Sequence, residues 1–376
     1  MENKKYDYLI VGSGLFGAVF AHEMTKRGFS CLVIEKRANI GGNIFCEEVE
    51  GINIHKYGPH IFHTNDKYIW DYVNQFVEFN HFRYSPIARY KDEQYSLPFN
   101  MNTFYQLWKT KTPEEAKRKL IEQIAQIKIK HPKNLEQQAL NICGQEIYEK
   151  LIRGYTEKQW GRPAKELPTF IIKRIPFRLT YDNNYFNDTY QGIPVGGYNR
   201  LIDGLLKNID VKLNIDYLQY RDELNKVAEK VLYTGSIDAF FDYKFGKLEY
   251  RSLIFKEEAL AIENFQGVAV VNYTDCETPF TRIIEHKHFE FGRQKNTVIT
   301  YEYPQKYKEG LNEPYYPINN TTNNHLYGKY KSLALENDMF LFGGRLTEYK
   351  YYDMHQVIAS ALSMVKRMTI LNNSKH

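Results

Sequence analysis

The stretch that decides the fold runs from Tyr8 to Asn43 and reads YLIVGSGLFGAVFAHEMTKRGFSCLVIEKRANIGGN. An apolar strand leads into the glycine turn GSGLFG (12–17), then into a helical run, a second apolar strand and an acid, Glu35. This order of strand, glycine turn, helix, strand and acid is typical of dinucleotide-binding folds. A glycine-rich turn in another kind of α/β protein is the alternative.

Each glycine of the turn has its own physical role in this prediction. Gly12 allows the tight turn, Gly14 lets the backbone approach a pyrophosphate, and Gly17 lets the helix pack closely on its strand. The helix N-terminus then offers free N–H groups and a positive dipole end to the phosphates. Glu35 lies where an acid can hydrogen-bond a ribose hydroxyl. We therefore predict that this stretch binds a dinucleotide.

The residues after the acid indicate which dinucleotide is bound. Gly41, Gly42 and Asn43 follow Glu35 within a few positions. Such a double glycine resembles FAD enzymes of the glutathione-reductase and amine-oxidase type more than NAD dehydrogenases. A simple turn between two strands is the alternative.

Composition limits the class of protein. The chain has 376 residues, 43% hydrophobic and 25% charged, which is typical of an ordinary soluble protein of two or three domains. The net charge of +5 comes without a long basic block, so it does not indicate nucleic-acid binding but suits a small anionic substrate. The 31 Tyr and 23 Phe suit a polar site that also stacks on rings, or reflect compositional drift.

The sequence predicts a reduced, cytoplasmic protein without a bound metal. The four cysteines are scattered, and no pair has metal-binding or redox spacing. The N-terminus leads straight into a strand, which leaves no room for a signal peptide. No run reaches the roughly 18 apolar residues of a membrane span.

The order of elements predicts a mixed α/β fold in three parts. The strand and glycine of Val231–Gly235 repeat the logic of the first unit, whereas 245–303 reads as successive strands and Thr112-Pro113-Glu114-Glu115 as a helix start. We expect a Rossmann-like FAD-binding domain assembled from separated segments, an inserted helical domain and a mostly antiparallel substrate domain. The expected ranges are 1–80, 195–245 and 335–376 for the FAD domain, 81–100, 166–194 and 246–334 for the sheet domain, and 101–165 for the helical domain.

Three local predictions concern the connecting segments. Residues 66–79 have the spacing of an amphipathic helix, 167–178 reads as a strand-like apolar run, and the polar segment 319–324 is expected to be a loop. Arg174 lies within the apolar run, so it needs an anionic partner if it is buried. That partner is either a ligand or an internal carboxylate.

The loop YGPHIFHT (57–64) directly follows the predicted cofactor unit. Its Gly-Pro bend brings His60 and His63 into one loop. Contact with the cofactor and an ordinary solvated or hydrogen-bonded role are both open for these histidines on the residues alone.

Taken together, the motifs of this chain resemble the UDP-galactopyranose mutase family of the bacterial type over nearly the whole length. The motifs that carry the resemblance are YGPHIFHT (57–64), GYTEKQWGR (154–162), FIIKRIPFR (170–178), DNNYF (182–186), QGIPVGGYNR (191–200), TRIIEHKHF (281–289), EPYYP (313–317) and GGRLTEYKYYDM (343–354).

The resemblance implies a flavoenzyme that interconverts UDP-galactopyranose and UDP-galactofuranose without net redox change. In the family, FAD is active when reduced. Flavin N5 attacks the anomeric carbon, UDP leaves, the flavin–sugar adduct opens, and the sugar recloses through its O4. The resemblance also implies NAD(P)H or a reductase as the electron source and a homodimer.

The resemblance assigns roles to residues at matching positions. Arg174 and Arg282 would stabilise the leaving diphosphate, and the segment between Trp160 and Arg178 would hold a mobile loop that closes on UDP. The expected substrate-binding residues are Tyr84, Tyr155, Trp160, Arg174, Tyr185, Asn272, Arg282, Glu302, Tyr316 and Tyr351. Tyr155 would stack on uracil, Trp160, Asn272 and Glu302 would line the sugar pocket, and Tyr185, Tyr316 and Tyr351 would bind phosphate.

The flavin side is implied in the same way. The His60 loop would lie against the isoalloxazine ring, where its backbone would tune N5. The expected cofactor-binding residues are Gly12, Gly14, Phe16, Gly17, Glu35, Gly42, Asn43, His60, Ile61, Arg345, Asp353 and Met354.

Two departures from the family pattern concern the substrate. Relatives often carry Asn where this chain has Tyr84, and a phenol there is larger and lacks an amide's paired donor and acceptor. This leaves open the sugar preference, including acceptance of an N-acetylated galactose. One extra residue between Glu302 and Tyr316 makes Tyr315 a possible substitute for Tyr316.

Two other functions remain as alternatives at this point. An FAD-dependent oxidase of the amine-oxidase type would share the cofactor fold but need an apolar or amine-accepting tunnel. A non-catalytic nucleotide-sugar binding protein would keep FAD without turnover.

Overall fold

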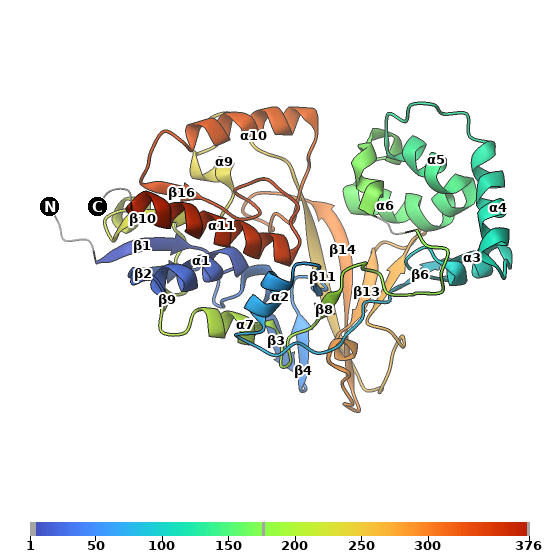
Figure 1. Cartoon of the computed structure of the whole chain (residues 1–376), viewed down its shortest axis with the longest axis horizontal. Helices are drawn as coiled ribbons and strands as arrows, with labels where there is room; N and C mark the ends of the chain where they lie inside the picture. Colours follow the sequence, from blue (N-terminus) through green and yellow to red (C-terminus); the bar gives the residue numbers. More distant parts are fainter. Residues whose placement is uncertain (1–4, 175–176, 374–376) are drawn as a thin grey trace.

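The computed structural model describes residues 5–174 and 177–373, except for the side chains of Lys173, Arg174 and residues 371–373. A parallel sheet with its helices lies at one end of the molecule, a helical lobe lies at the other, and a second sheet lies between them (Figure 1). The mixed α/β class predicted from the sequence is confirmed.

The first sheet contains the strands of the glycine-turn unit. Its order is β16 (Phe340–Phe342), β10 (Ala228–Tyr233), β1 (Tyr6–Val11), β2 (Cys31–Ile34) and β9 (Asp210–Lys212). All neighbouring strands are parallel. Segments near residues 230 and 340 therefore join the sheet that the N-terminus begins.

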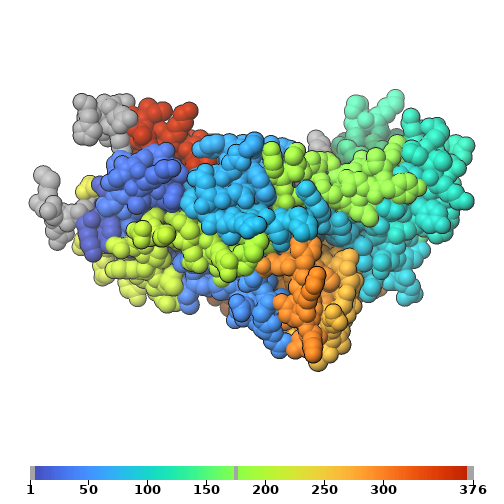
Figure 2. All heavy atoms as spheres, turned by 60° about the horizontal axis from the view of Figure 1, so that its bottom comes forward, coloured from blue at the N-terminus to red at the C-terminus, as the bar shows by residue number. Residues whose placement is uncertain are grey.

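Helices cover the faces of this sheet, and most residues of the central strands β1, β2 and β10 are buried, as is typical of parallel sheets. Helix α1 (Leu15–Thr25) packs against α11 (Met354–Asn373) and α7 (Tyr198–Leu205), and α2 (Lys67–Val73) packs on α11. Figure 2 shows the N-terminal segments and the segment near residue 200 side by side on one face.

The second sheet is antiparallel except for one parallel pair, β12 with β6. Its order is β15 (Tyr316–Pro317), β11 (Tyr250–Leu260), β14 (Thr297–Lys306), β13 (Arg282–Glu285), β12 (Val270–Tyr273), β6 (Ile87–Tyr90) and β7 (Glu93–Ser96). The long β11–β14 pair forms the twisted centre of the molecule (Figure 1).

The helical lobe starts with a sequence-encoded cap. The Thr112 side chain accepts a hydrogen bond from the Glu115 backbone and the Glu115 side chain accepts one from the Thr112 backbone, as the capping-box rule predicts. The lobe comprises α3 (Met101–Trp108), α4 (Pro113–Ala125), α5 (Leu135–Ile147), the π-helix η2 (Tyr148–Arg153), α6 (Gly154–Trp160) and the 3-10 helices η3 (Ala164–Glu166) and η4 (Thr169–Arg174).

Shorter elements connect these bodies. They are η1 (Gly42–Ile44), the hairpin β3 (Cys46–Val49) with β4 (Ile52–His55), the pair β5 (Phe62–Thr64) with β8 (Tyr190–Gly192), α8 (Arg221–Leu224), α9 (Ile237–Phe240), η5 (His286–Glu290) and α10 (Thr321–Leu333). No helix of the described residues is long and apolar enough to span a bilayer.

Three local predictions were wrong. The described part of the run 167–178 is not a strand: residues 169–174 form η4, because Pro168 cannot donate to a ladder and the apolar residues Leu167 and Ile172 are buried in the helical core beside α5 instead. The segment 319–324 is not a loop, since Asn320 caps α10 through its side chain. The helix expected over 66–79 ends at Val73.

The space around two helical glycines predicts that replacing each by alanine changes the free energy of unfolding in opposite directions. A Cβ at Gly17 would lie 2.1 Å from the Gly12 carbonyl oxygen, whereas a Cβ at Gly328 in α10 would meet no heavy atom within 4 Å. We expect Gly17→Ala to lower the free energy of unfolding by about 1–3 kcal/mol through overpacking. Gly328→Ala should raise it by about 0.5–1 kcal/mol because helical glycine costs backbone entropy. Urea unfolding measures both; destabilisation by both alike would contradict the packing argument.

Candidate active site

A cavity of about 1070 Å³ runs from the carboxyl ends of β1, β2 and β10 to the face of the second sheet. The ends of parallel strands are where α/β folds bind ligands. The volume lies at the upper end of the roughly 300–1,000 Å³ of ordinary ligand pockets. The predicted residues that line it are Gly12, Gly14, Phe16, Gly17, Glu35, Gly42, Asn43, His60, Ile61, Tyr84, Tyr155, Tyr185, Asn272, Arg282, Glu302, Tyr316, Arg345, Tyr351, Asp353 and Met354.

Two glycine turns meet at the dinucleotide end. The Cα of Gly14 would lie only 3.0 Å from a Cβ at Gly42, so no side chain fits between the two turns. Gly14 caps α1 without a side-chain hydrogen bond, which leaves the first N–H groups of the helix for an anion. The pair of turns therefore forms a narrow backbone cradle of the kind that accepts a pyrophosphate.

Glu35 is held rigidly beside this cradle. Its Oε2 accepts from the Ser13 backbone N–H at 3.0 Å and from the Ser13 hydroxyl at 2.8 Å, and its Oε1 accepts from the Arg37 N–H at 3.1 Å. The side chain is buried but lines the cavity. A carboxylate has further acceptor positions, so Glu35 can still receive a ribose hydroxyl.

A chain of three histidines, of which His55 and His286 are buried, supports the loop that carries His60. The His60 N–H donates to His55 Nδ1 at 3.2 Å, and the His55 N–H donates to His286 Nδ1 at 3.1 Å. The other ring nitrogen of His286 lies 2.7 Å from the Thr300 hydroxyl of β14. The loop is therefore fastened, through β4 and η5, to β14 of the second sheet, and the histidine acceptors must be unprotonated.

Burial keeps these imidazoles neutral. It lowers the pKa of His286 to about 3 and, with the charge of Arg345, that of His60 to about 4. Burial and the neighbouring histidines lower the pKa of His55 far below its ordinary range. The buried His60 Nε2 has no hydrogen-bond partner among the described residues.

Asn272, Arg282 and Glu302 form a row across three adjacent strands. Asn272 of β12 pairs in register with Arg282 of β13, which in turn pairs with Glu302 of β14. Register partners project from the same face of a sheet, so all three side chains face the cavity. Asn272 Oδ1 and Glu302 Oε2 are buried without a hydrogen-bond partner in the described structure, as expected where a polar ligand binds.

The charges of this row are matched. Arg282 Nε donates to Glu302 Oε1 at 2.8 Å, and the Arg282 side chain is 16% exposed. Burial acts to lower the pKa of Arg282, but Glu302 and the surrounding phenols raise it well above its ordinary value. Arg282 therefore stays cationic in the cavity, and Glu302 takes only its Nε.

Phenols surround this cation. Tyr316 stacks on Tyr351 with ring centroids 5.4 Å apart, and Tyr155 and Tyr84 lie within the field of Arg282. Burial raises the pKa of Tyr84, Tyr155 and Tyr316, so these hydroxyls remain donors at neutral pH.

Tyr315 and Tyr316 point to different neighbours. Tyr316 is near Tyr351, Glu302 and Arg282, whereas the Tyr315 ring packs on Phe255 and lies nearer to Arg37. The Tyr315 carbonyl accepts a hydrogen bond from Arg345. The extra residue upstream therefore does not move Tyr316 away from the row.

Tyr84 belongs to an aromatic wall. Its ring lies 5.4 Å from that of Tyr185 and 5.6 Å from that of Phe186, and Phe186 stacks on His63 at 3.7 Å. With 7% of its surface exposed, Tyr84 has little room to move.

Two expected substrate residues are not placed in the cavity lining. Trp160 ends α6 and packs on the helical core rather than among the lining residues. Arg174 ends η4, but its side chain lies outside the described residues.

The sequence prediction missed several residues that line the cavity. Loops 215–218 and 309–312 line the dinucleotide end, and no composition or spacing signalled them. His63, Asp353 and His355 form a cluster whose ligand atoms lie within 4.8 Å of one another, although no metal-binding set was predicted. His63 Nδ1 is already bound to the Asp188 carboxylate, so we interpret the cluster as a contact between segments.

The histidine chain predicts acid lability. Below pH 6.5 the unfolded chain takes up protons on these histidines, whereas the folded chain binds them only near pH 4 or below. The free energy of unfolding should therefore decrease as the pH is lowered below 6.5. The decrease should be up to about 1.4 kcal/mol per pH unit for each histidine. His286→Asn keeps an acceptor for His55 but removes one titrating group, so its slope between pH 6.5 and 5 should be shallower in urea unfolding. His131→Asn on the surface is the control; equal slopes for the two variants would contradict this account.

Comparison with known proteins finds related families and sequences. The family model for UDP-galactopyranose mutase matches residues 150–351, and that for an NAD(P)-binding Rossmann-like domain matches 10–76. A probable UDP-galactopyranose mutase of Klebsiella pneumoniae is 40% identical, covering 96% of this chain and 94% of its own. The dTDP-fucopyranose mutase of Escherichia coli is 36% identical, and the match covers 98% of this chain and 99% of that protein.

A solved structure agrees at the level of fold. The crystal structure of a reduced UDP-galactopyranose mutase superposes with a TM-score of 0.74 at 14% identity, covering 97% of this chain and 96% of that one. From the family model and the near full-length relatives together, the chain belongs to the UDP-galactopyranose mutase family.

Proposed function

We propose that this protein interconverts UDP-galactopyranose and UDP-galactofuranose, with reduced FAD as its bound cofactor and no net redox change. The observation that carries the proposal is the row of Asn272, Arg282 and Glu302 at one end of a cavity whose other end is the glycine cradle. One cavity can thus hold a dinucleotide and a nucleotide sugar in contact.

The residues present fit FAD. The cradle of Gly14 and Gly42 can accept a pyrophosphate, and Glu35 can accept a hydrogen bond from a ribose hydroxyl. The loop that carries the uncharged His60 lines the same cavity as this cradle and the row of Asn272, Arg282 and Glu302. Asp353 and Met354 begin α11 at the same cavity, where the helix N-terminus favours an electron-rich edge. When bound, a reduced flavin supplies the nucleophile for the anomeric carbon.

The remaining chemistry is electrostatic. As UDP leaves the sugar, negative charge develops on the diphosphate, and Arg282 supplies a fixed positive charge beside it. Tyr185, Tyr316 and Tyr351 supply donors to the phosphate oxygens, and Tyr155 a ring for the base. Asn272 and Glu302 hold the sugar hydroxyls through their unpartnered oxygens. Arg174 adds the second guanidinium by the family resemblance.

Removing the buried guanidinium tests this assignment. Arg282→Ala should lower kcat by at least about 100-fold while FAD remains bound, because one preorganised donor is worth about that factor. Since the variant also leaves Glu302 without its partner, Arg282→Lys serves as a second variant and should retain more activity. Arg293→Ala, an exposed arginine between β13 and β14, is the matched control. Wild-type kcat in Arg282→Ala would refute the role in charge stabilisation.

A second candidate substrate is dTDP-fucopyranose. The E. coli relative that carries this name matches this chain over nearly its full length. The wall of Tyr84 and Phe186 would tolerate a methyl group where galactose carries a hydroxymethyl. We keep UDP-galactose first because the family model and the relative with higher identity carry that name.

The deciding experiment incubates the purified protein with UDP-galactofuranose, its N-acetyl analogue and dTDP-fucofuranose, and separates the products by chromatography. We expect conversion of UDP-galactofuranose to the pyranose after dithionite reduction and little conversion in the oxidised protein. Equal activity in the oxidised state would contradict the reduced cofactor. Preference for the dTDP sugar would select the second candidate, and oxygen consumption matching product would indicate an oxidase.

NAD(P)H or a reductase as electron source, and a homodimer, stay predictions from the family resemblance. Electron transfer can be followed as bleaching of the flavin by NADH or NADPH, and the oligomeric state by sedimentation.

A further inference from the structure

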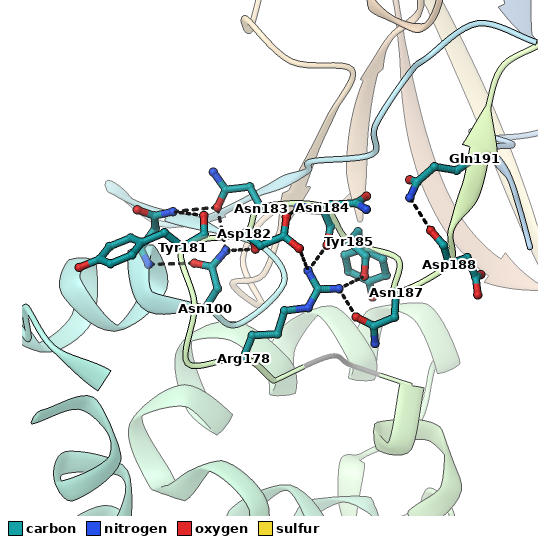
Figure 3. Close-up of polar contacts among 11 residues, drawn as sticks. Asn100, Arg178, Tyr181, Asp182, Asn183, Asn184, Tyr185, Asn187, Asp188 and Gln191 are labelled. Atoms are coloured by element: carbon teal, nitrogen blue, oxygen red, sulfur yellow. Dashed lines mark hydrogen bonds and ion pairs between the residues drawn. The ribbon is translucent and has the colours of Figure 1, made fainter. Parts of the chain in front are cut away.

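Arg178 closes the motif FIIKRIPFR, so its charge suggests a third guanidinium for the diphosphate. The structure places it elsewhere: Arg178 is not among the residues that line the cavity, and its side chain is 12% exposed. The guanidinium donates to Asp182 Oδ2 at 3.0 Å, to the Asn184 carbonyl, to the Tyr185 carbonyl at 3.4 Å and to Asn187 Oδ1 (Figure 3). Its donors are used within the protein.

These acceptors come from one segment without regular structure, 182–187. Figure 3 shows the segment curving around the guanidinium. Two consecutive carbonyls, those of Asn184 and Tyr185, are satisfied by one side chain in place of a strand or helix. A planar guanidinium with five donors suits this task, and an ammonium does not.

The same segment is fastened at further points. The Tyr185 N–H donates to the Tyr84 carbonyl at 2.7 Å. Upstream, Asn100 Nδ2 donates to the Asp182 carbonyl at 2.8 Å, and downstream Asp188 binds His63 and Asn65. The backbone of Tyr185 is thus held on both sides, while its ring lines the cavity beside Tyr84.

We propose that Arg178 is a positioning residue for Tyr185. It fixes the two peptide groups that flank Tyr185, through the Asn184 and Tyr185 carbonyls, and so orients the phenol toward the nucleotide sugar. The role rests on the proposed function, in which Tyr185 binds the diphosphate. It differs from direct diphosphate binding because Arg178 acts through Tyr185.

A double-mutant cycle separates the two roles. Arg178→Lys keeps the charge but loses the fork, so we expect the Kd for UDP and the KM for UDP-galactofuranose to rise about tenfold, with kcat within about threefold of wild type. Tyr185→Phe should raise the same Kd and KM by a similar factor. The double variant should be no more than about twofold weaker than Tyr185→Phe alone, because residues that act through one another are not additive.

The matched control is Arg27→Ala. Arg27 also donates to a carboxylate and a carbonyl, those of Glu23, but it follows α1 and does not line the cavity. Its Kd for UDP should equal the wild-type value. Asn187→Ala, which removes one acceptor of Arg178, should raise Kd less than Arg178→Lys does.

Readouts are Kd by calorimetry, flavin content by absorbance and the midpoint of thermal unfolding. Additive losses in the double variant, or unchanged Kd in Arg178→Lys with normal unfolding, would overturn the positioning role. Absence of UDP binding and turnover in the wild-type protein would instead overturn the proposed function.

Discussion

A guanidinium kept charged inside a cavity is the constraint on which the rest of the site depends. Arg282 can remain there only because Glu302 shares a ladder position with it and phenols surround it. The carboxylate neutralises one edge of the guanidinium and leaves the other for an anion. A positive charge is therefore already fixed at this end of the cavity in the folded protein before any ligand binds.

Sheet register gives this arrangement its precision. Asn272, Arg282 and Glu302 are spread along the chain, but neighbouring strands bring them into one row. A slip of one residue in any pairing would turn one side chain to the opposite face. The His55–His286–Thr300 contacts then fix the loop that carries His60 to the same sheet. This loop and the row of Asn272, Arg282 and Glu302 are therefore positioned by one sheet.

The aromatic side of the cavity is built differently. Tyr84, Tyr185 and Phe186 lie in segments without ladder hydrogen bonds, and the Arg178 and Asn100 side chains hold the backbone of the segment that carries Tyr185 and Phe186. Polar clamps of this kind fix a loop without adding a strand. This aromatic wall of the cavity is therefore set by contacts outside the cavity.

By itself, the sequence determined the dinucleotide unit, because glycine spacing, apolar strands and Glu35 are local signals with one geometric meaning. Its motifs also identified the family, and most of the site residues they predicted do line the cavity. It misjudged 167–178 and 319–324, where a short apolar run and an asparagine cap are ambiguous without their packing partners. Only the tertiary structure decided that Tyr316 rather than Tyr315 adjoins Arg282, that Trp160 packs on the helical core, and that Arg178 is used within the protein. Side-chain direction and charge pairing depend on contacts between distant segments, which no local pattern encodes.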